Sequence, residues 1–387
     1  MAQWTNWSGR LQTKSAQLHF CRSEQDVINL VSGITRNGET LRVAGATHSH
    51  ATLITGADHV LDLRGLSGIV NVDSQARTAW VRAGTRIYAL GAALHAHGLA
   101  LLNQGDIDEQ AIAGAIATGT HGTGEALRNL SASVLGLRIV LANGEVAVWE
   151  AGDPMWQASR LNLGAFGVIT QVKLQLTEPY VLQETSATLP LADAMASITQ
   201  RMSDHRHCEF FWSPQTDEAS LKWIDVSDEA PAYPVAEEGT RRAWSHEVLP
   251  NYRPHKHTEM EYSVPKARGP ECMHEIAELL RNRYTNVAWP VEYRSLAADD
   301  VWLSTAYERD TITLSVHEDV RVDETAYYTE CERIFLAHEG RPHWGKVNYL
   351  DGPTLASIHP RWDDWWTARN SVDPTGTFLN DYLRTLT

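Results

Sequence analysis

The sequence contains little cysteine, and its cysteines follow no ligand spacing. Only Cys21, Cys208, Cys272 and Cys331 occur among 387 residues, and they form no CxxC pair. A disulfide framework or a cysteine-bound zinc site requires regularly spaced cysteines, so neither is indicated. We therefore predict ordinary reduced thiols.

Long apolar runs and excess positive charge are absent as well. No stretch approaches the 18 or so apolar residues of a membrane span, and the opening MAQWTNWSGR lacks the basic and apolar regions of a secretion signal. The formal charge of -15 argues against a nucleic-acid or anionic-membrane surface, because both require positive patches. We expect a cytoplasmic protein with a small-molecule ligand, no nucleic-acid partner and no membrane partner.

Two common nucleotide-binding glycine motifs are also missing. Neither GxGxxG nor GxxxxGK[ST] occurs, which removes the main support for a classical Rossmann or P-loop site. Three other glycine-rich stretches are present, at 45–48, 104–124 and 163–170. Within the middle stretch, residues 113–124 carry few large side chains, so their backbone N–H groups and hydroxyls can face a pyrophosphate. A tightly packed small-residue helix followed by a loop is equally typical of this stretch, and both interpretations stay open.

Local signals indicate alternating strands and helices in the first part of the chain. Ser23 and Asp26 form a capping-box pattern, and apolar residues then recur at helical spacing until Gly38, which predicts a helix. Asn143-Gly144 lies between two apolar runs and predicts a hairpin.

The pattern changes near residue 180. Longer strand-like stretches follow up to about residue 335, with a helix over 272–281 between them. This is typical of an α+β domain with an antiparallel sheet. From residue 341 the composition changes again, with proline, glycine and many aromatic residues in a short space.

An ordered set of motifs runs along nearly the whole chain. They are RVAGATHSH (42–50), DLRGL (62–66), VRAGTRI (81–87), GDIDEQAIAGAIATGTHGTG (105–124), LGAFGVIT (163–170), RPHWGK (341–346) and the closing DPTGTFLNDYL (373–383). The set resembles the vanillyl-alcohol-oxidase-type FAD flavoproteins. More narrowly, it is similar to their aldonolactone oxidase branch, which holds L-gulonolactone oxidase, D-arabinonolactone oxidase and alditol oxidase.

The resemblance implies an α+β fold. It implies a two-part FAD-binding domain of the PCMH type with an inserted α+β substrate (cap) domain built on an antiparallel sheet. The corresponding boundaries are 1–178 for the FAD-binding domain, 179–340 for the cap domain and 341–387 for the segment that returns to the FAD domain.

The resemblance also assigns one histidine to the cofactor. The histidine of the G-x-x-H-S motif carries FAD through a bond from an imidazole nitrogen to the 8α-methyl carbon of the flavin, and His48 occupies that position. Such a bond requires a neutral, nucleophilic imidazole. Relatives often carry other residues at the position of His50, so no bond is assigned to it.

Other FAD contacts implied by the resemblance come from glycine backbone and hydroxyl groups. The residues are Gly45, Ala46, Thr47, Ser49, Gly105, Ile112, Gly114, Thr118, Thr120, His121, Gly122, Thr123, Gly164, Gly167 and Ile169. Ser49, Thr118 and Thr120 also suit capping of a helix or turn. In the family, a glycine at the position of Gly105 favours an oxidase over a dehydrogenase. It also suits a turn.

The predicted catalytic residues are Glu292, Arg294 and Lys346. Glu292 and Arg294 are two apart, hence on one face of a strand, although such a pair is also typical of a surface ion pair. The resemblance implies that they line the cavity above the flavin, and that Lys346 reaches the reacting oxygen. A positive side chain there stabilises the alkoxide that develops as hydride leaves the carbinol carbon.

The predicted substrate contacts are Asp106, Glu259, His317 and His343. Several relatives have serine at the position of Asp106, so this carboxylate turns away, pairs with a cation or changes the substrate contacts. Glu259, or its neighbour Met260, falls where alditol oxidase uses an amide.

One strand also carries a superficial metal pattern in His255, His257, Glu259 and Glu261. Donors at alternate positions along one extended face are spread too widely to converge on one ion without a further donor. We therefore predict no metal.

The sequence as a whole predicts an FAD-dependent oxidase of a sugar-derived polyol. The first candidate substrate is an aldonolactone resembling L-gulono-1,4-lactone, with hydride transfer to covalently bound flavin and oxygen as the acceptor, giving hydrogen peroxide. The alternatives are an alditol oxidase of the xylitol or sorbitol type and an aldonolactone dehydrogenase with another electron acceptor. A flavin-carrying or ligand-binding protein without turnover is the alternative outside enzymes.

Overall fold

Three sheets organise the protein, whose computed structural model describes residues 3–387. The strands are β1 (Gln17–Phe20), β2 (Leu41–Ala44), β3 (His59–Asp62), β4 (Ile69–Asp73), β5 (Thr78–Arg82), β6 (Val134–Val140), β7 (Val146–Glu150), β8 (Val168–Gln175), β9 (Val181–Pro190), β10 (His207–Trp212), β11 (Glu218–Ser227), β12 (Arg242–Trp244), β13 (His257–Pro265), β14 (Val291–Leu296), β15 (Thr311–Asp319) and β16 (Arg341–Pro342). The α-helices are α1 (Glu24–Asn37), α2 (Ile87–Ala96), α3 (Ile112–Thr118), α4 (Pro154–Ser159), α5 (Leu191–Asp204), α6 (Ser245–Val248), α7 (Gly269–Asn282), α8 (Thr325–Ala337), α9 (Gly352–Ile358), α10 (Trp362–Val372) and α11 (Asp381–Thr385).

The first part of the chain builds two small sheets. One is parallel, in the order β1-β3-β2, and the other is antiparallel, in the order β4-β5-β8-β6-β7. The predicted helix α1 is confirmed, with Ser23 and Asp26 forming the capping box and Gly38 ending the helix in the left-handed region. The predicted hairpin is confirmed as well, since Gly144 at φ 82° turns the chain from β6 into β7.

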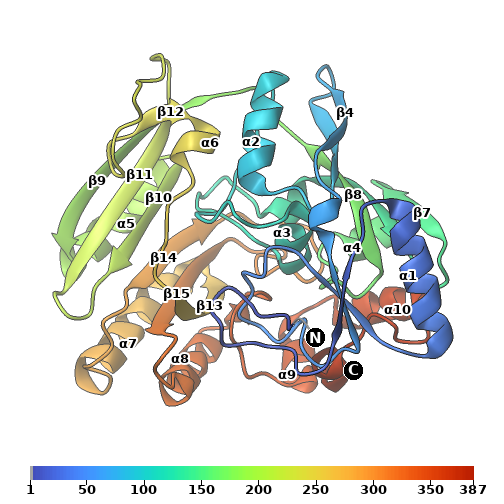
Figure 1. Cartoon of the computed structure of the whole chain (residues 1–387). Helices are drawn as coiled ribbons and strands as arrows, with labels where there is room; N and C mark the ends of the chain where they lie inside the picture. Colours follow the sequence, from blue (N-terminus) through green and yellow to red (C-terminus); the bar gives the residue numbers. More distant parts are fainter. Residues whose placement is uncertain (1–2) are drawn as a thin grey trace.

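An eight-stranded antiparallel sheet follows, in the order β12-β9-β11-β10-β14-β15-β13-β16. Figure 1 shows α7 and α8 side by side beneath this sheet. Met260, Tyr262, Tyr293 and Leu314 point from its strands into the core that these helices and α5 share. Side chains alternate between the two faces of a strand, so their neighbours are directed to the opposite face. That opposite face carries the charged residues of the cavity described below.

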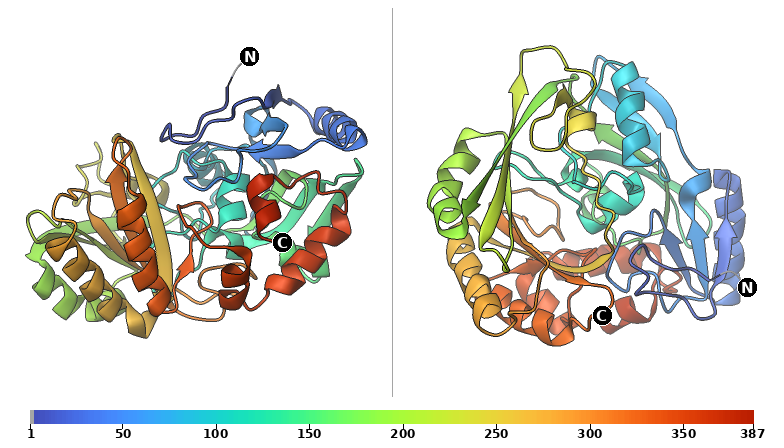
Figure 2. Two further views of the ribbon diagram at one scale, coloured as in Figure 1. Left: turned by 90° about the horizontal axis from the view of Figure 1, so that it is seen from below. Right: turned by 60° about the vertical axis from the view of Figure 1, so that its left-hand side comes forward.

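The C-terminal segment packs into the N-terminal core. The Trp365 indole donates to the Leu161 carbonyl at 3.0 Å, and the Arg369 guanidinium donates to the Ala165 carbonyl at 3.2 Å. Figure 2 shows the last helices against the N-terminal part of the molecule. Val301, from within 179–340, joins the same core. The C-terminal packing agrees with the predicted return of this segment to the FAD domain, whereas Val301 shows that the core is not confined to 1–178 and 341–387. The boundaries at 178 and 340 stay a prediction.

The fold class is confirmed as a PCMH-type FAD-binding domain with a cap on an antiparallel sheet. Within residues 3–387, no helix combines the length and apolar character needed to cross a membrane.

Candidate active site

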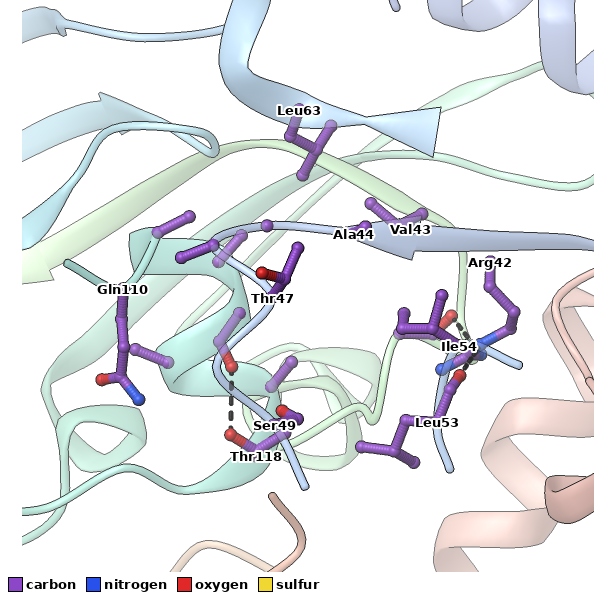
Figure 3. Close-up of a pocket in the computed structure, with 18 of the residues that line it drawn as sticks. Arg42, Val43, Ala44, Thr47, Ser49, Leu53, Ile54, Leu63, Gln110 and Thr118 are labelled. Carbon is purple, nitrogen blue, oxygen red and sulfur yellow. Dashed lines mark hydrogen bonds between the residues drawn. The ribbon is translucent and has the colours of Figure 1, made fainter. Parts of the chain in front are cut away.

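The first cavity lies between the loop after β2, the start of α3 and the turn before β8. Figure 3 shows Thr47, Ser49 and Thr118 around it, with Gln110 and Arg42 at opposite ends. The Thr118 hydroxyl donates to the Gly114 carbonyl at 3.1 Å, one turn earlier in α3. The walls are therefore mostly backbone and small side chains, which suits a phosphate-containing ligand.

Backbone conformation requires small residues around this cavity. Thr47 is held at φ 66°, where its carbonyl accepts from the Trp7 backbone N–H at 2.7 Å. Gly164 lies at φ 65°, and a Cβ on Gly45 would meet the Ala111 Cβ at 3.0 Å. A Cβ on Gly114 would meet no neighbouring atom within 4 Å. These positions keep room for a ligand against the backbone.

Arg42 ties three distant segments to this cavity. Its buried guanidinium donates to the carbonyls of Leu53 at 2.5 Å, Gly164 at 3.0 Å and Phe378 at 2.6 Å. Burial lowers the pKa of Arg42 to about 9. Sequence reasoning did not assign Arg42 a role, because a single arginine in a strand carries no local signal for such contacts.

Most of the predicted cofactor residues lie around the first cavity. They are Gly45, Ala46, Thr47, His48, Ser49, Gly114, Thr118, Gly164, Gly167 and Ile169. Gly105, Thr120 and His121 line a second cavity instead. Ile112, Gly122 and Thr123 line none of the cavities described here. The Ile112 side chain is part of the core, and the Thr123 hydroxyl donates to the Cys208 carbonyl at 2.9 Å.

The second cavity, of about 410 Å³, lies over the charged face of the eight-stranded sheet. It brings together every predicted catalytic and substrate residue: Glu292, Arg294, Lys346, Asp106, Glu259, His317 and His343. Glu292 and Arg294 are buried, so the surface ion-pair interpretation of this pair is wrong.

A network centred on Glu261 holds Arg294. One Glu261 oxygen accepts from His121 Nε2 at 2.9 Å, and the other accepts from Arg294 at 2.7 Å and from Ser315 at 2.8 Å. Glu292 lies 3.0 Å from the same guanidinium. Glu261 was not among the predicted site residues, although its spacing of two from Glu259 on a strand is the signal that indicates it.

Lys346 and Asp106 also have charged partners. The Lys346 ammonium is paired with Glu259. Asp106 lies 3.0 Å from Arg253 and 4.0 Å from Lys222. Burial alone would raise the pKa of Asp106, but Lys222 and Arg253 outweigh it and lower the pKa to about 2. Of the outcomes considered for Asp106, pairing with a cation is therefore the one observed.

A third cavity, of about 550 Å³, adjoins both. It shares His48, Ser49 and Thr118 with the first cavity, and His343 and Lys346 with the second. The three cavities thus form one continuous route from the glycine-rich loops to the charged face of the sheet.

His48 lies on this route in a form suited to nucleophilic attack. Burial, with Arg86 and Lys346 nearby, lowers the pKa of His48 to about 4. The ring of Trp7 stacks on the imidazole at 5.6 Å. The imidazole is therefore neutral at physiological pH and fixed in orientation, as bond formation to a flavin requires.

The residues present fit an FAD. An elongated dinucleotide needs a backbone-lined cradle for its phosphates, and the first cavity supplies it. The buried Thr120 hydroxyl, on the second cavity, has no hydrogen-bond partner among the described residues, as expected for a group that serves a ligand.

Comparison with known proteins agrees with this geometry. Residues 15–149 match the FAD binding domain family, and residues 232–386 match the D-arabinono-1,4-lactone oxidase family. L-gulono-1,4-lactone dehydrogenase from Mycobacterium tuberculosis is 32% identical over 98% of both chains. The chain belongs to the aldonolactone oxidase branch of the vanillyl-alcohol-oxidase-type FAD flavoproteins.

Other members of the branch align over the same length. Alditol oxidase from Streptomyces sp. is 30% identical over 99% of this chain and 98% of its own. L-gulonolactone oxidase from Mus musculus is 24% identical over 98% of this chain and 97% of its own. The fold is shared more widely, since cholesterol oxidase from B. sterolicum superposes with a TM-score of 0.89 at 18% identity, over 99% of this chain and 96% of that one. As a member of this branch, the protein binds FAD and is an FAD-dependent oxidoreductase acting on CH–OH groups.

The Glu292 carboxyl predicts a pH-dependent stability. Burial raises its pKa to about 8 from 4.5, although Arg294 opposes the shift. Between these pH values the folded state keeps a proton that the unfolded state has released, so the free energy of unfolding falls as pH rises. We expect Glu292→Gln to lose less stability than the wild type between pH 5 and pH 9, measured by urea denaturation. Parallel profiles would show that Glu292 is already ionised at pH 5.

Proposed function

We propose that the protein oxidises an aldonolactone resembling L-gulono-1,4-lactone, with FAD attached to His48 and molecular oxygen as the acceptor, giving hydrogen peroxide. The observation that carries the proposal is one cavity holding two cations, Arg294 and Lys346, and continuous with the glycine-lined cavity that contains His48. The names of the relatives support a sugar-derived substrate.

In the proposed reaction, bound flavin supplies the hydride acceptor. The chain supplies charge for the oxygen that loses its proton. Arg294 is held in place by Glu261 and Glu292. Lys346 is held by a different carboxylate, Glu259. A cation that is fixed in a largely buried site stabilises an alkoxide more strongly than the same charge in solution.

His343 has a defined proton position in this arrangement. Its Nδ1 accepts the Gly345 backbone N–H at 3.0 Å, so in the neutral ring the proton is on Nε2. Burial lowers the pKa of His343 to about 4, which keeps the ring neutral. His343 Nε2–H is therefore a fixed donor, available to a substrate hydroxyl.

The covalent attachment is tested on His48. We expect the yellow colour of the purified protein to stay with the chain after acid precipitation, and to move to the supernatant in His48→Ala. The matched control is His50→Ala, the neighbouring imidazole, which should keep the colour bound. Free flavin released from the wild type would contradict the link while leaving FAD binding intact.

Oxygen consumption tests the acceptor. Gly105 lines the second cavity, and the family resemblance links a glycine at this position to oxidase activity. We expect stoichiometric oxygen uptake and hydrogen peroxide with an aldonolactone. Flavin bleaching under anaerobic conditions with no turnover in air would contradict the oxidase.

A second candidate is an aldonolactone dehydrogenase, favoured by the relative of that name from Mycobacterium tuberculosis. It would turn over with an artificial electron acceptor and not with oxygen. The alditol oxidase relative keeps a xylitol- or sorbitol-type substrate as the third candidate. A panel of lactones, alditols and sugars, followed by anaerobic flavin bleaching, separates the substrates and also exposes a binding protein without turnover. The cytoplasmic location stays a prediction.

A further inference from the structure

A cluster of three histidines and one glutamate lies where the second and third cavities meet. It consists of His50, His257, Glu259 and His317. Donor atoms of His50, His257 and Glu259 lie within 4.8 Å of one another. In the sheet register, Glu259 on β13 lies opposite His317 on β15. The loop that carries His50 is held by a hydrogen bond from the His50 backbone N–H to the Gly345 carbonyl, at 2.7 Å. His50 from a loop and His317 from β15 thus add the further donors that β13 alone lacks for a metal site.

Hydrogen bonds to backbone carbonyls orient two of the rings. His257 Nδ1 lies 3.0 Å from the His255 carbonyl, and His317 Nδ1 lies 2.8 Å from the Pro290 carbonyl. A carbonyl only accepts, so each Nδ1 carries a proton. In a neutral ring Nε2 then presents a lone pair, and a carbonyl bound to the other ring nitrogen is the usual support of a metal-binding histidine.

Both lone pairs are directed at the same carboxylate. His257 Nε2 lies 3.7 Å from one Glu259 oxygen, and His317 Nε2 lies 3.8 Å from the other. These distances exceed a hydrogen bond. They are close to the roughly 3.0–3.5 Å that separates two donors bound to one ion at about 2.1 Å.

A second, independent observation that indicates a ligand at this cluster is the unsatisfied ring nitrogen of His50. Its side chain is only 9% exposed, and its Nδ1 has no hydrogen-bond partner among the described residues. The ring lies parallel to His257, with centroids 5.8 Å apart and planes at 30°. A buried nitrogen without a partner is costly unless a ligand satisfies it.

The neighbouring group of His121, Glu261 and His343 behaves differently. It is equally compact, but Glu261 already accepts from His121, Arg294 and Ser315. Both oxygens of its carboxylate are therefore already hydrogen-bonded to protein groups. Of these two groups, it is the Glu259 group that leaves imidazole lone pairs facing a carboxylate.

We propose that His50, His257 and Glu259 bind a first-row divalent transition-metal ion, with His317 as an adjacent fourth donor. Imidazole and carboxylate donors suit ions of this class, and three protein ligands leave positions open to the cavity. Water or a substrate hydroxyl can occupy these positions. The sequence-based prediction of no metal is thereby revised.

Equilibrium dialysis of the full-length flavoprotein against cobalt(II) chloride tests the site. We expect one equivalent per chain, with Co²⁺ bands at wavelengths beyond the flavin absorption. His257→Ala and Glu259→Gln should each weaken binding at least about tenfold, because loss of even an outer-shell partner of a metal ligand typically costs about 10–100-fold. His19→Ala, which removes a histidine paired with His59 in the first sheet, should leave binding unchanged.

Lys346→Met sharpens the test. Its ammonium pairs with Glu259, so removing it should tighten Co²⁺ binding on the order of tenfold, as expected for loss of a like charge nearby. Absence of stoichiometric cobalt, or cobalt retained in both ligand variants, would overturn the proposal. Binding is measured without substrate, so its outcome is independent of the proposed oxidase activity. Circular dichroism of each variant separates ligand loss from unfolding.

Discussion

Lys346→Met is expected to lower kcat/KM by roughly 10²–10³-fold, the usual cost of losing one preorganised charge at a developing oxyanion. Lys346 lines both the cavity that contains His48 and the cavity that contains Arg294. It is therefore placed between the proposed flavin attachment and the substrate. Because the ammonium acts mainly on the transition state, the loss should fall on kcat more than on KM. Single-turnover flavin bleaching under anaerobic conditions measures this step.

Lys266→Met is the matched control for this prediction. Lys266 pairs with Glu125 at 2.6 Å, outside the three cavities, and its loss should leave kcat/KM unchanged. Lys346→Arg keeps the positive charge and should recover part of the lost rate. A rate for Lys346→Met within twofold of the wild type would assign alkoxide stabilisation to Arg294 alone.

Arg294→Met is expected to lower the free energy of unfolding by about 3–5 kcal/mol, the range for breaking a buried ion pair. Its guanidinium lies 2.7 Å from Glu261 and 3.0 Å from Glu292, and all three side chains are buried. Removal leaves a carboxylate buried without its cation. Urea denaturation of the flavoprotein measures the loss.

A double variant separates charge from packing. Arg294→Met combined with Glu261→Gln removes the uncompensated carboxylate and should restore part of the lost stability, whereas a pure packing defect would not be rescued. Arg281→Met is the control, because Arg281 pairs with Asp217 in a largely exposed position and such pairs contribute within about 1 kcal/mol. Equal losses in Arg281→Met and Arg294→Met would refute the proposed compensation.

Local sequence signals were sufficient to predict individual helices and turns, but not the full hydrogen-bond network around Glu261. The capping box at Ser23 and the turn at Gly144 depend on residues close in sequence, and both predictions are confirmed. Arg294 and Lys346 were predicted as site residues from the family resemblance, and both line the second cavity. Glu261 carries the network that holds Arg294, but its importance depends on contacts with His121, Arg294 and Ser315. Periodicity along one strand does not specify those partners.

Strand register accounts for the largest change in interpretation. His255 and three residues of β13, His257, Glu259 and Glu261, were judged too widely spaced to converge on one ion without a further donor. In the structure these residues face different partners on β15: Glu259 lies opposite His317, and Glu261 lies opposite Ser315. His50 then approaches from a loop more than 200 residues away. Pairing between strands and loop placement are long-range properties, so sequence spacing alone does not predict the resulting donor sets.

The contacts of Arg42 have a consequence for biosynthesis. Its guanidinium donates to the Phe378 carbonyl, 336 residues later in the chain, as well as to the Gly164 carbonyl beside the first cavity. Synthesis proceeds from the N-terminus, so this clamp cannot close until Phe378 has been made. We therefore expect cofactor capture to follow synthesis of the segment that contains Phe378, although the N-terminal strands are the first to be made.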